Sequence, residues 1–427
     1  MAAPMASTLA LKILARASGV PALRQGEIAT CKVDLAMMHD SGGPRRVKPM
    51  LEKLGVGVWD PSKIVLVTDH YVPAVDAESA AILDLTRKWA AANGIARFHD
   101  MQGICHVILP ENGYLKPGMF AVGGDSHSPT GGAFGAYMFG IGATEMAGVL
   151  ATGEIWVRAP GTHLVRWTGA LGKGVSAKDI MLKLCRAMTL SAVKYDVVEF
   201  AGPAIEKLPM IERLVLANMS AELGAQTGLI APDAVTRDFL AGKGVELADA
   251  DLARWRSDPD AEFTRTWTFD AAELAPQIAA PHSPENSDAA AAHKGTRIQQ
   301  AYIGACTGAK LVDLHMAAAV LKGRKVAAGT RLLIAPASQR TTTEAAADGT
   351  LATLLGAGAI LLPTGCGACA GYGAGVLAED ETCLSSTARN FKGRMGHPKS
   401  RVYLGSPYSV AAAAVAGEIV DPREFLA

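Results

Sequence analysis

The stretch "LPTGCGACAGYGAG", residues 362–375, separates Cys366 and Cys369 by two residues in a run rich in glycine and alanine. It continues the apolar run "GAILLP", residues 358–363, and a second apolar run, "AYIGA", residues 301–305, ends just before Cys306. Short apolar runs bounded by glycine are typical of buried strands. We therefore expect all three thiols just past the carboxyl ends of strands, where α/β sheets build their sites.

The C-x-x-C pattern has three chemical interpretations. A redox pair usually begins a helix, but the following "AGYGAG" is a poor helix former. A structural zinc site needs four nitrogen or sulfur ligands, and Cys383 is the available fourth. Three thiolates with one open position suit an iron–sulfur cluster with one iron left for substrate. The residues alone favour the cluster and leave the zinc site as an alternative.

Composition sets limits on the class of protein. The 427 residues, 49% of them hydrophobic, are enough for two or three domains with a large core. Lys plus Arg and Asp plus Glu number 41 each, which predicts neither a nucleic acid nor a membrane as partner. Seven widely spaced cysteines predict a reducing compartment, the cytoplasm, rather than a disulfide framework.

Apolar strand-like runs alternate with helical stretches along the chain, which predicts an α/β fold with largely parallel sheets. The expected strands lie within 62–69, 118–125, 162–169, 301–305, 331–336 and 358–363, and the clearest helices within 78–94, 177–190 and 312–323. Residues 9–19, "LALKILARASG", predict a short amphipathic helix that ends at a glycine, rather than a targeting segment. The Pro- and Ala-rich stretch 279–295 is expected to be a linker.

Seven motifs follow one another along the chain: "TDH" (68–70), "GICHVILPENG" (103–113), "GGDSHSPTGG" (123–132), "NMSAELGA" (218–225), "IGACTG" (303–308), "GCGACAG" (365–371) and "ARNFKGRMG" (388–396). In these motifs the chain resembles the aconitase superfamily, from about residue 10 to its end. The resemblance implies three α/β/α-layered domains, at 1–160, 161–285 and 286–427. It also implies a 4Fe-4S cluster held by Cys306, Cys366 and Cys369, with one iron open to substrate.

Dehydration of a malate requires an acid for the leaving hydroxyl, a base, and cations for the carboxylates. Imidazoles beside carboxylates meet the acid–base requirement, and the chain offers Asp69 with His70, Asp125 with Ser126 and His127, and the further His106. The resemblance makes His70 the acid for the leaving hydroxyl. It also makes His127 and Glu222 supports for substrate oxygens at the cluster.

Further residues are expected to contact the substrate. Asn218 is a positioning group by the resemblance, and His39 and Asp40 fall near another substrate-contacting position. Arg389 and Arg394 are the expected carboxylate clamps, because a guanidinium gives bidentate, permanently charged recognition.

The implied activity is that of a hydro-lyase on a substituted malate, with 3-isopropylmalate, as in leucine biosynthesis, the leading substrate. Relatives usually carry Asn where this chain has Gly308 and Ala388, and a Gly-Thr-Gly segment where it has "SAVKYD", residues 191–196. A dehydratase for 2,3-dimethylmalate or homoaconitate is therefore an alternative. An alternative of another class is a non-enzymatic scaffold or a zinc protein.

A partner is also expected. Single-chain aconitases continue into a swivelling fourth domain that supplies the serine base and further arginines, whereas this sequence stops after "GEIVDPREFLA". By the resemblance, a separate small subunit should supply the base and further contacts to the dicarboxylate substrate.

Overall fold

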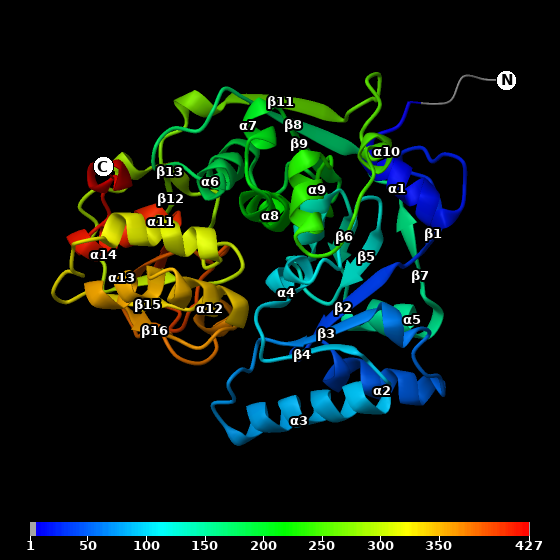
Figure 1. Ribbon diagram of the computed structural model, residues 1–427, viewed down its shortest axis with the longest axis horizontal. Coiled ribbons are helices and arrows are strands. Elements are labelled where there is room, and N and C mark those ends of the chain that lie inside the picture. The colour runs from blue at the N-terminus through cyan, green and yellow to red at the C-terminus, as the bar shows by residue number, and fades with distance from the viewer. Residues whose placement is uncertain (1–5, 427) are drawn as a thin grey trace.

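The computed structural model describes residues 6–426, which form three sheets and a two-stranded ribbon (Figure 1). The chain begins with α1 (Leu9–Ser18), which ends at Gly19 in the left-handed region. The helix expected over 9–19 is thus confirmed. The ribbon pairs β1 (Ile28–Lys32) with β7 (Glu154–Arg158) in antiparallel register.

The first sheet is wholly parallel, in the order β4-β3-β2-β5-β6. Its strands are β2 (Leu35–His39), β3 (Ile64–Thr68), β4 (Arg97–Asp100), β5 (Phe120–Gly123) and β6 (Tyr137–Gly140). One face packs on α2 (Pro44–Leu54), α3 (Ala77–Ala92) and α5 (Ala143–Thr152), and the other on α4 (Cys105–Glu111) and the 3-10 helix η2 (Ser128–Phe134). The strand order reverses between β2 and β5, which opens a crevice at their carboxyl ends.

The second sheet is also parallel, in the order β10-β9-β8-β11. Its strands are β8 (Thr162–Thr168), β9 (Val197–Ala201), β10 (Thr227–Ile230) and β11 (Arg265–Asp270). The accompanying helices are α6 (Ala177–Met188), α7 (Pro203–Glu206), α8 (Met210–Met219), η3 (Ser220–Leu223), α9 (Ala234–Ala241) and α10 (Asp249–Arg254). Helix α8 lies between this sheet and the first one (Figure 1).

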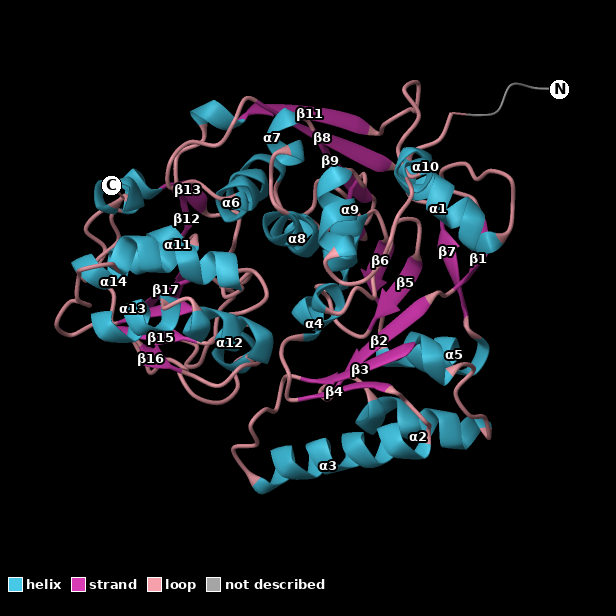
Figure 2. Cartoon of the chain, in the orientation of Figure 1, coloured by secondary structure: helices cyan, strands magenta, loops and turns pink. Residues whose placement is uncertain are grey.

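The third sheet is mixed, in the order β13-β12-β18-β17-β14-β15-β16. Its strands are β12 (Gln277–Ala279), β13 (Ser287–Ala289), β14 (Gln300–Ile303), β15 (Arg331–Ile334), β16 (Ile360–Leu361), β17 (Thr382–Ser385) and β18 (Arg401–Leu404). Helices α11 (Leu311–Leu321), α12 (Gln339–Ala347), α13 (Thr350–Ala357) and α14 (Pro407–Ala416) complete this part (Figure 2). Side chains of β14 alternate: Ala301 and Ile303 pack toward α11 and α14, and Tyr302 packs toward α6.

The expected α/β fold with largely parallel sheets is confirmed. The expected linker at 279–295 is wrong, because this stretch contains β13 and the 3-10 helix η5 (Ala290–His293), and β12 pairs with both β13 and β18. Residues from 277 onward thus join the third sheet, although the division into domains at 160 and 285 stays a prediction. Within residues 6–426, no helix combines the length and apolar character needed to cross a bilayer.

The contact between η2 and β10 depends on a glycine. A Cβ at Gly132 would overlap the carbonyl oxygen of Gly228, whereas a Cβ at the exposed Gly148 of α5 would meet nothing within 4 Å. We expect Gly132→Ala to lower the free energy of unfolding by at least ~1–3 kcal/mol, because backbone must move to admit the methyl group. Gly148→Ala should leave it unchanged or raise it by up to ~1 kcal/mol. Urea unfolding of both variants measures the free energy of unfolding. Equal values for the two variants would contradict the close contact between Gly132 and Gly228.

Candidate active site

The candidate acid–base residues lie along one edge of the first sheet. His39 ends β2, Asp69 and His70 follow β3, and the loop after β5 carries Asp125. Because the strands are parallel, their carboxyl ends meet at the same edge. The structure therefore brings together residues that are up to about ninety positions apart in the chain.

Asp69 and His70 form a directed pair. The His70 Nδ1–H donates to Asp69 Oδ1 at 2.7 Å, and Asp69 Oδ2 accepts from the Cys105 N–H at 2.7 Å. The His70 ring stacks on His39 with 4.1 Å between centroids. Nε2 of His70 makes no hydrogen bond with any described residue, so this nitrogen is the one that can face a substrate.

The charges of the stacked imidazoles differ. Burial disfavours the His70 imidazolium, but the charge and hydrogen bond of Asp69 outweigh burial and raise the pKa of His70 to about 9. Burial, followed by the charge of His70, lowers the pKa of His39 to about 4. At neutral pH His70 therefore carries a proton that its Nε2 can donate, and His39 is neutral.

The polar atoms of His39 and Asp40 form hydrogen bonds with the protein backbone. His39 Nε2 donates to the Gly124 carbonyl at 3.1 Å, and its Nδ1 accepts from the Gly42 N–H at 3.3 Å. Asp40 is fully buried and accepts from the N–H groups of His70 and Tyr71, at 3.1 and 2.9 Å. The oxygens of Asp40 hold the turn that presents His70, and a substrate contact by Asp40 stays a prediction.

Glu222, in η3 beside the second sheet, contacts a residue from a loop of the first sheet and one from a loop of the third. Its Oε1 accepts from Arg389 Nε at 2.6 Å and lies 3.1 Å from His127 Nε2. Burial opposes the charge of Glu222, but His127 and Arg389 together lower its pKa. Its Oε2 is buried and has no partner among the described residues. The carboxylate thus holds Arg389 in place and leaves one oxygen for a further donor.

Two more contacts extend this group. His106 Nε2 donates to Asp125 Oδ1 at 2.7 Å, and Arg389 Nη1 donates to the exposed Ser126 Oγ at 2.9 Å. Burial raises the pKa of the Cys369 thiol, an effect that the charges of Arg394 and then Lys178 oppose. Arg394 therefore lies near the cysteines, while Arg389 lies in the Glu222 group. The half-buried Arg394 has an Nε without a partner within residues 6–426.

The three candidate cysteines lie on loops of the third sheet. Cys306 follows β14, Cys366 directly precedes the 3-10 helix η6 (Gly367–Ala370), and Cys369 lies within that helix. Asn218 Nδ2 donates to Cys306 Sγ at 3.2 Å and to Thr130 Oγ1 at 2.8 Å. The Cys366 N–H donates to the Asp69 carbonyl at 2.8 Å. The cysteine loops are therefore joined directly to the residues predicted for acid–base work.

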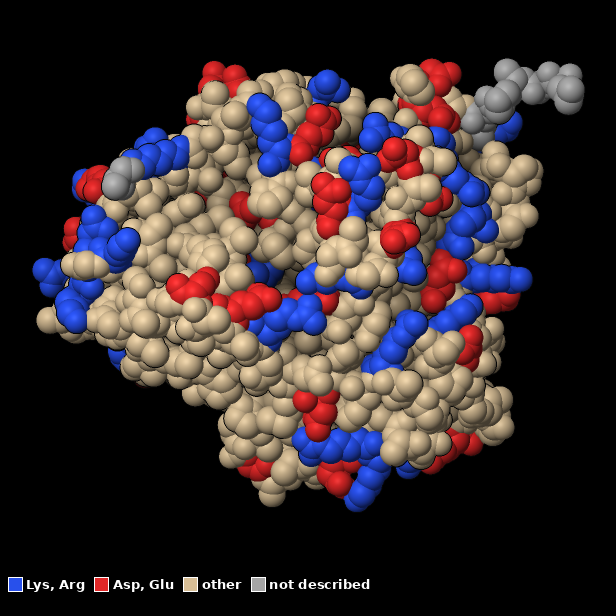
Figure 3. Space-filling view, in the orientation of Figure 1, with Lys and Arg blue, Asp and Glu red and all other residues tan. Residues whose placement is uncertain are grey.

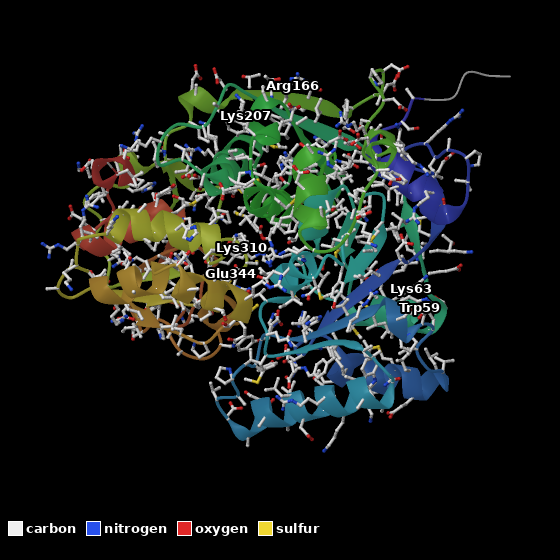
Figure 4. All side chains as sticks on the ribbon, viewed as in Figure 1. Trp59, Lys63, Arg166, Lys207, Lys310 and Glu344 are labelled. Atoms are coloured by element: carbon white, nitrogen blue, oxygen red, sulfur yellow. The ribbon has the colours of Figure 1, made fainter. Side chains whose placement is uncertain are left out.

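Two buried lysines that sequence reasoning missed hold the loops after β17 and β14. Lys178 Nζ donates to the carbonyls of Thr387 and Ser386 at 2.6 and 3.0 Å. Lys310, which is labelled in Figure 4, donates from its Nζ to the Cys306 carbonyl at 3.0 Å. Burial lowers the pKa of Lys178 to about 8. The sequence does carry a pattern that predicts the burial of Lys178. This lysine lies three and four positions before the apolar Met181 and Leu182, on the buried face of α6.

The structure explains one departure from the family pattern. A Cβ at Gly308 would overlap Ser386 Oγ, and that hydroxyl accepts from the Gly304 N–H at 3.1 Å. Ser386 therefore occupies the space that an asparagine at 308 would need. Ala388 is buried, and nothing in the structure explains why it replaces an amide.

A cavity of about 370 Å³ opens beside this group. Asp125, Ser126 and Arg389 line one part of it, and the other lining residues include Pro129, Ile141, Tyr195, Ala221, Ala225 and Gln226. The volume lies in the range of small-molecule sites. One part of the lining is charged and another largely apolar, which suits a small anion with an apolar substituent.

A family model described as "Aconitase family (aconitate hydratase)" matches residues 12–417. The chain belongs to the aconitase family. The resemblance seen in the motifs and the expected class of enzyme, a hydro-lyase, are thereby confirmed.

The aconitase-family chain is similar over its whole length to curated proteins. It is 43% identical to "3-isopropylmalate dehydratase large subunit 1" of Methanopyrus kandleri, over 99% of this chain and 100% of the relative. It is 44% identical to a "Probable methanogen homoaconitase large subunit" of Methanosarcina mazei, over 92% and 99%. A crystal structure of aconitase X from Thermococcus kodakaraensis shares the fold, with a TM-score of 0.50 and 14% identity over 89% of this chain and 88% of that one.

The pKa of His70 yields a test of the Asp69–His70 pair. A His pKa raised from 6.5 to about 9 contributes stability that is fully present below pH 6.5 and is lost as pH rises through 9. Asp69→Asn should remove this contribution, because burial lowers the pKa of His70 and the charge of Asp69 would no longer oppose that effect. Between pH 6 and pH 10 the free energy of unfolding of the parent should fall relative to that of Asp69→Asn by at most about 3 kcal/mol.

The control is Asp84→Asn, which removes an exposed carboxylate paired with Lys88 on α3. Its unfolding should follow the pH dependence of the parent. Urea unfolding at the two pH values, with NMR titration of the His70 ring, provides the measurement. A His70 pKa near 9 in Asp69→Asn would show that Asp69 does not set it.

Proposed function

We propose that this chain is the large subunit of a hydro-lyase that removes water from a substituted malate and adds it back, with 3-isopropylmalate as the substrate. The observation that carries the proposal is the main-chain hydrogen bond that connects the turn of His70 to the loop of Cys366. A protonated imidazole with a free Nε2 lies on the turn whose Asp69 carbonyl accepts from the Cys366 N–H. The name of the Methanopyrus kandleri relative supports the choice of substrate.

The cysteines suit an iron–sulfur cluster better than a zinc ion. Zinc holds its sulfur ligands at about 2.3 Å from the metal, which places them within about 4 Å of one another. The described groups of three or more ligand atoms within 4.8 Å of one another contain only His and Asp, and no cysteine. The wider spacing of Cys306, Cys366 and Cys369 favours a 4Fe-4S cluster, and Asn218 then donates to the sulfur of one ligand.

When bound, a cluster held by three cysteines supplies a Lewis acid at its open iron. The chain's own residues then supply the rest. His70 donates the Nε2 proton to the leaving hydroxyl, and Asp69 fixes the ring orientation and the protonated state. Arg389 presents a guanidinium to a substrate carboxylate at the cavity, and Glu222 keeps it there. Arg394, near the cysteines, is the second proposed clamp.

A separate small subunit supplies the base in this proposal. The relatives named above are large subunits by name. Within the described site, His39 uses both ring nitrogens in the fold, and His106 and His127 are each paired with a carboxylate. The described imidazoles are thus engaged in other roles. No nucleic acid is proposed as partner, since acidic and basic side chains are interspersed over the face in Figure 3.

A substrate screen tests the function. The chain, reconstituted anaerobically with iron and sulfide and combined with its small subunit, should interconvert 3-isopropylmalate and 2-isopropylmalate. It should do so with a higher kcat/KM than for homoaconitate or 2,3-dimethylmalate. The ultraviolet absorbance of the unsaturated dicarboxylate follows the reaction. Conversion of another malate in preference would correct the substrate, and conversion of none by fully loaded protein would contradict the function.

Cysteine variants test the cluster separately. Cys366→Ser should lower bound iron and sulfide to a small fraction of the parent's, because one of three ligands is lost. Cys185→Ser, in the buried part of α6, should retain the parent's content, because Cys185 is a packing residue of the core. Chemical analysis of iron and sulfide after anaerobic reconstitution decides between these outcomes. Parental content in Cys366→Ser would remove it from the ligand set, and one zinc per chain would favour the zinc alternative.

A further inference from the structure

The hydroxyl of Tyr302 is buried and has no partner. Tyr302 lies in β14 with no exposed surface, and its ring packs in the core that also contains Leu333, Ala368 and Cys383. Its phenolic oxygen makes no hydrogen bond with any residue in the range 6–426. An unpaired buried hydroxyl is costly and rare in native proteins. Its presence points to an acceptor that is not one of these residues.

The place of this hydroxyl narrows the choice of acceptor. A Cβ at Gly304 would lie 2.6 Å from the Tyr302 oxygen, and a Cβ at Gly367 would lie 3.7 Å from it. Gly304 lies two residues before Cys306, and Gly367 directly follows Cys366. The hydroxyl therefore lies between the two loops that carry the three candidate ligands.

The chemistry of the phenol makes it a donor at this place. A tyrosine hydroxyl keeps its proton at neutral pH, because its ordinary pKa is about 10. Ser386, which follows β17, is engaged elsewhere, because its Oγ contacts the N–H and carbonyl of Gly304 at 3.1 and 3.2 Å.

We propose that Tyr302 is a positioning residue that donates its O–H hydrogen bond to a sulfur of the bound iron–sulfur cluster and thereby raises the reduction potential of the cluster. The inference rests on the proposed function only in requiring a cluster at the three cysteines. A donor at a sulfur favours the more negative, reduced state, because it offsets the added charge. The alternative acceptor is a buried water.

The test compares Tyr302→Phe with the parent chain, both full length and reconstituted anaerobically. The matched control is Tyr403→Phe, which removes a hydroxyl from β18 of the same sheet, where the ring lies 5.9 Å from His293. Iron and sulfide per chain are measured first. All three proteins should bind equal amounts, since phenylalanine fills the same space and no ligand is changed.

The deciding readout is the reduction potential of the cluster, from a redox titration followed by electron paramagnetic resonance. At a fixed solution potential, the ratio of reduced to oxidised cluster should fall about three- to tenfold in Tyr302→Phe, the range for one hydrogen bond. Tyr403→Phe should match the parent. Resonance Raman spectra of the parent in heavy water should show a shift in an iron–sulfur band that Tyr302→Phe lacks.

The effect of Tyr302→Phe on Tm should differ in sign between the cluster-free and the cluster-loaded protein. In the cluster-free protein, Tyr302→Phe should leave Tm equal or raised, because the unpaired hydroxyl is removed. In the loaded protein it should lower Tm, because a hydrogen bond is lost. A loaded cluster with an unchanged potential and an unchanged heavy-water shift would overturn this inference alone, and would favour the buried water. Failure of the parent to bind iron and sulfide would overturn the proposed function as well.

Discussion

The charge of Glu222 constrains the whole site, because a carboxylate with no exposed surface must be neutralised where it lies. His127 comes from the loop after β5, Arg389 from the loop after β17, and Glu222 itself from η3 beside the second sheet. The three sheets are thus joined at one buried charge. Removal of Glu222 would leave His127 without its carboxylate and Arg389 with only its contact to Ser126, so the three loops are held in register by electrostatics as well as by packing.

The position of the acid relative to the cysteines depends on main-chain contacts. The Cys366 N–H donates to the Asp69 carbonyl, and Gly365 has φ 149°, with its Cβ position 2.8 Å from that same oxygen. A side chain at 365 would push the two loops apart. Asp40 holds the other side of the turn through the N–H groups of His70 and Tyr71. The His70 ring is therefore fixed from both sides, which suits a group that must donate a proton in one direction.

Much of this could be predicted from local patterns. Apolar runs that end just before Cys306 and Cys366 predict these thiols past the carboxyl ends of strands, and the Asp69–His70 pair is adjacent in sequence. Other features depended on contacts that span the chain. Residues 279–295 have the composition of a linker, yet their strand β13 pairs with β12. The carboxylate of Asp40 accepts hydrogen bonds from backbone N–H groups some thirty residues away. Lys178 and Tyr302 belong to ordinary buried patterns, and only the three-dimensional packing reveals their polar ends near the cysteines.

In the proposed reaction, this chain binds, polarises and protonates the substrate, and a small subunit removes the proton. The most direct measurement is the steady-state rate of hydration of 2-isopropylmaleate by the cluster-loaded chain as the small subunit is added. The rate for the chain alone should be lower by about 10²–10⁴-fold, the usual contribution of a positioned base, and the rate should saturate at one partner per chain. Full activity of the chain alone, unchanged by the partner, would contradict this division of the reaction.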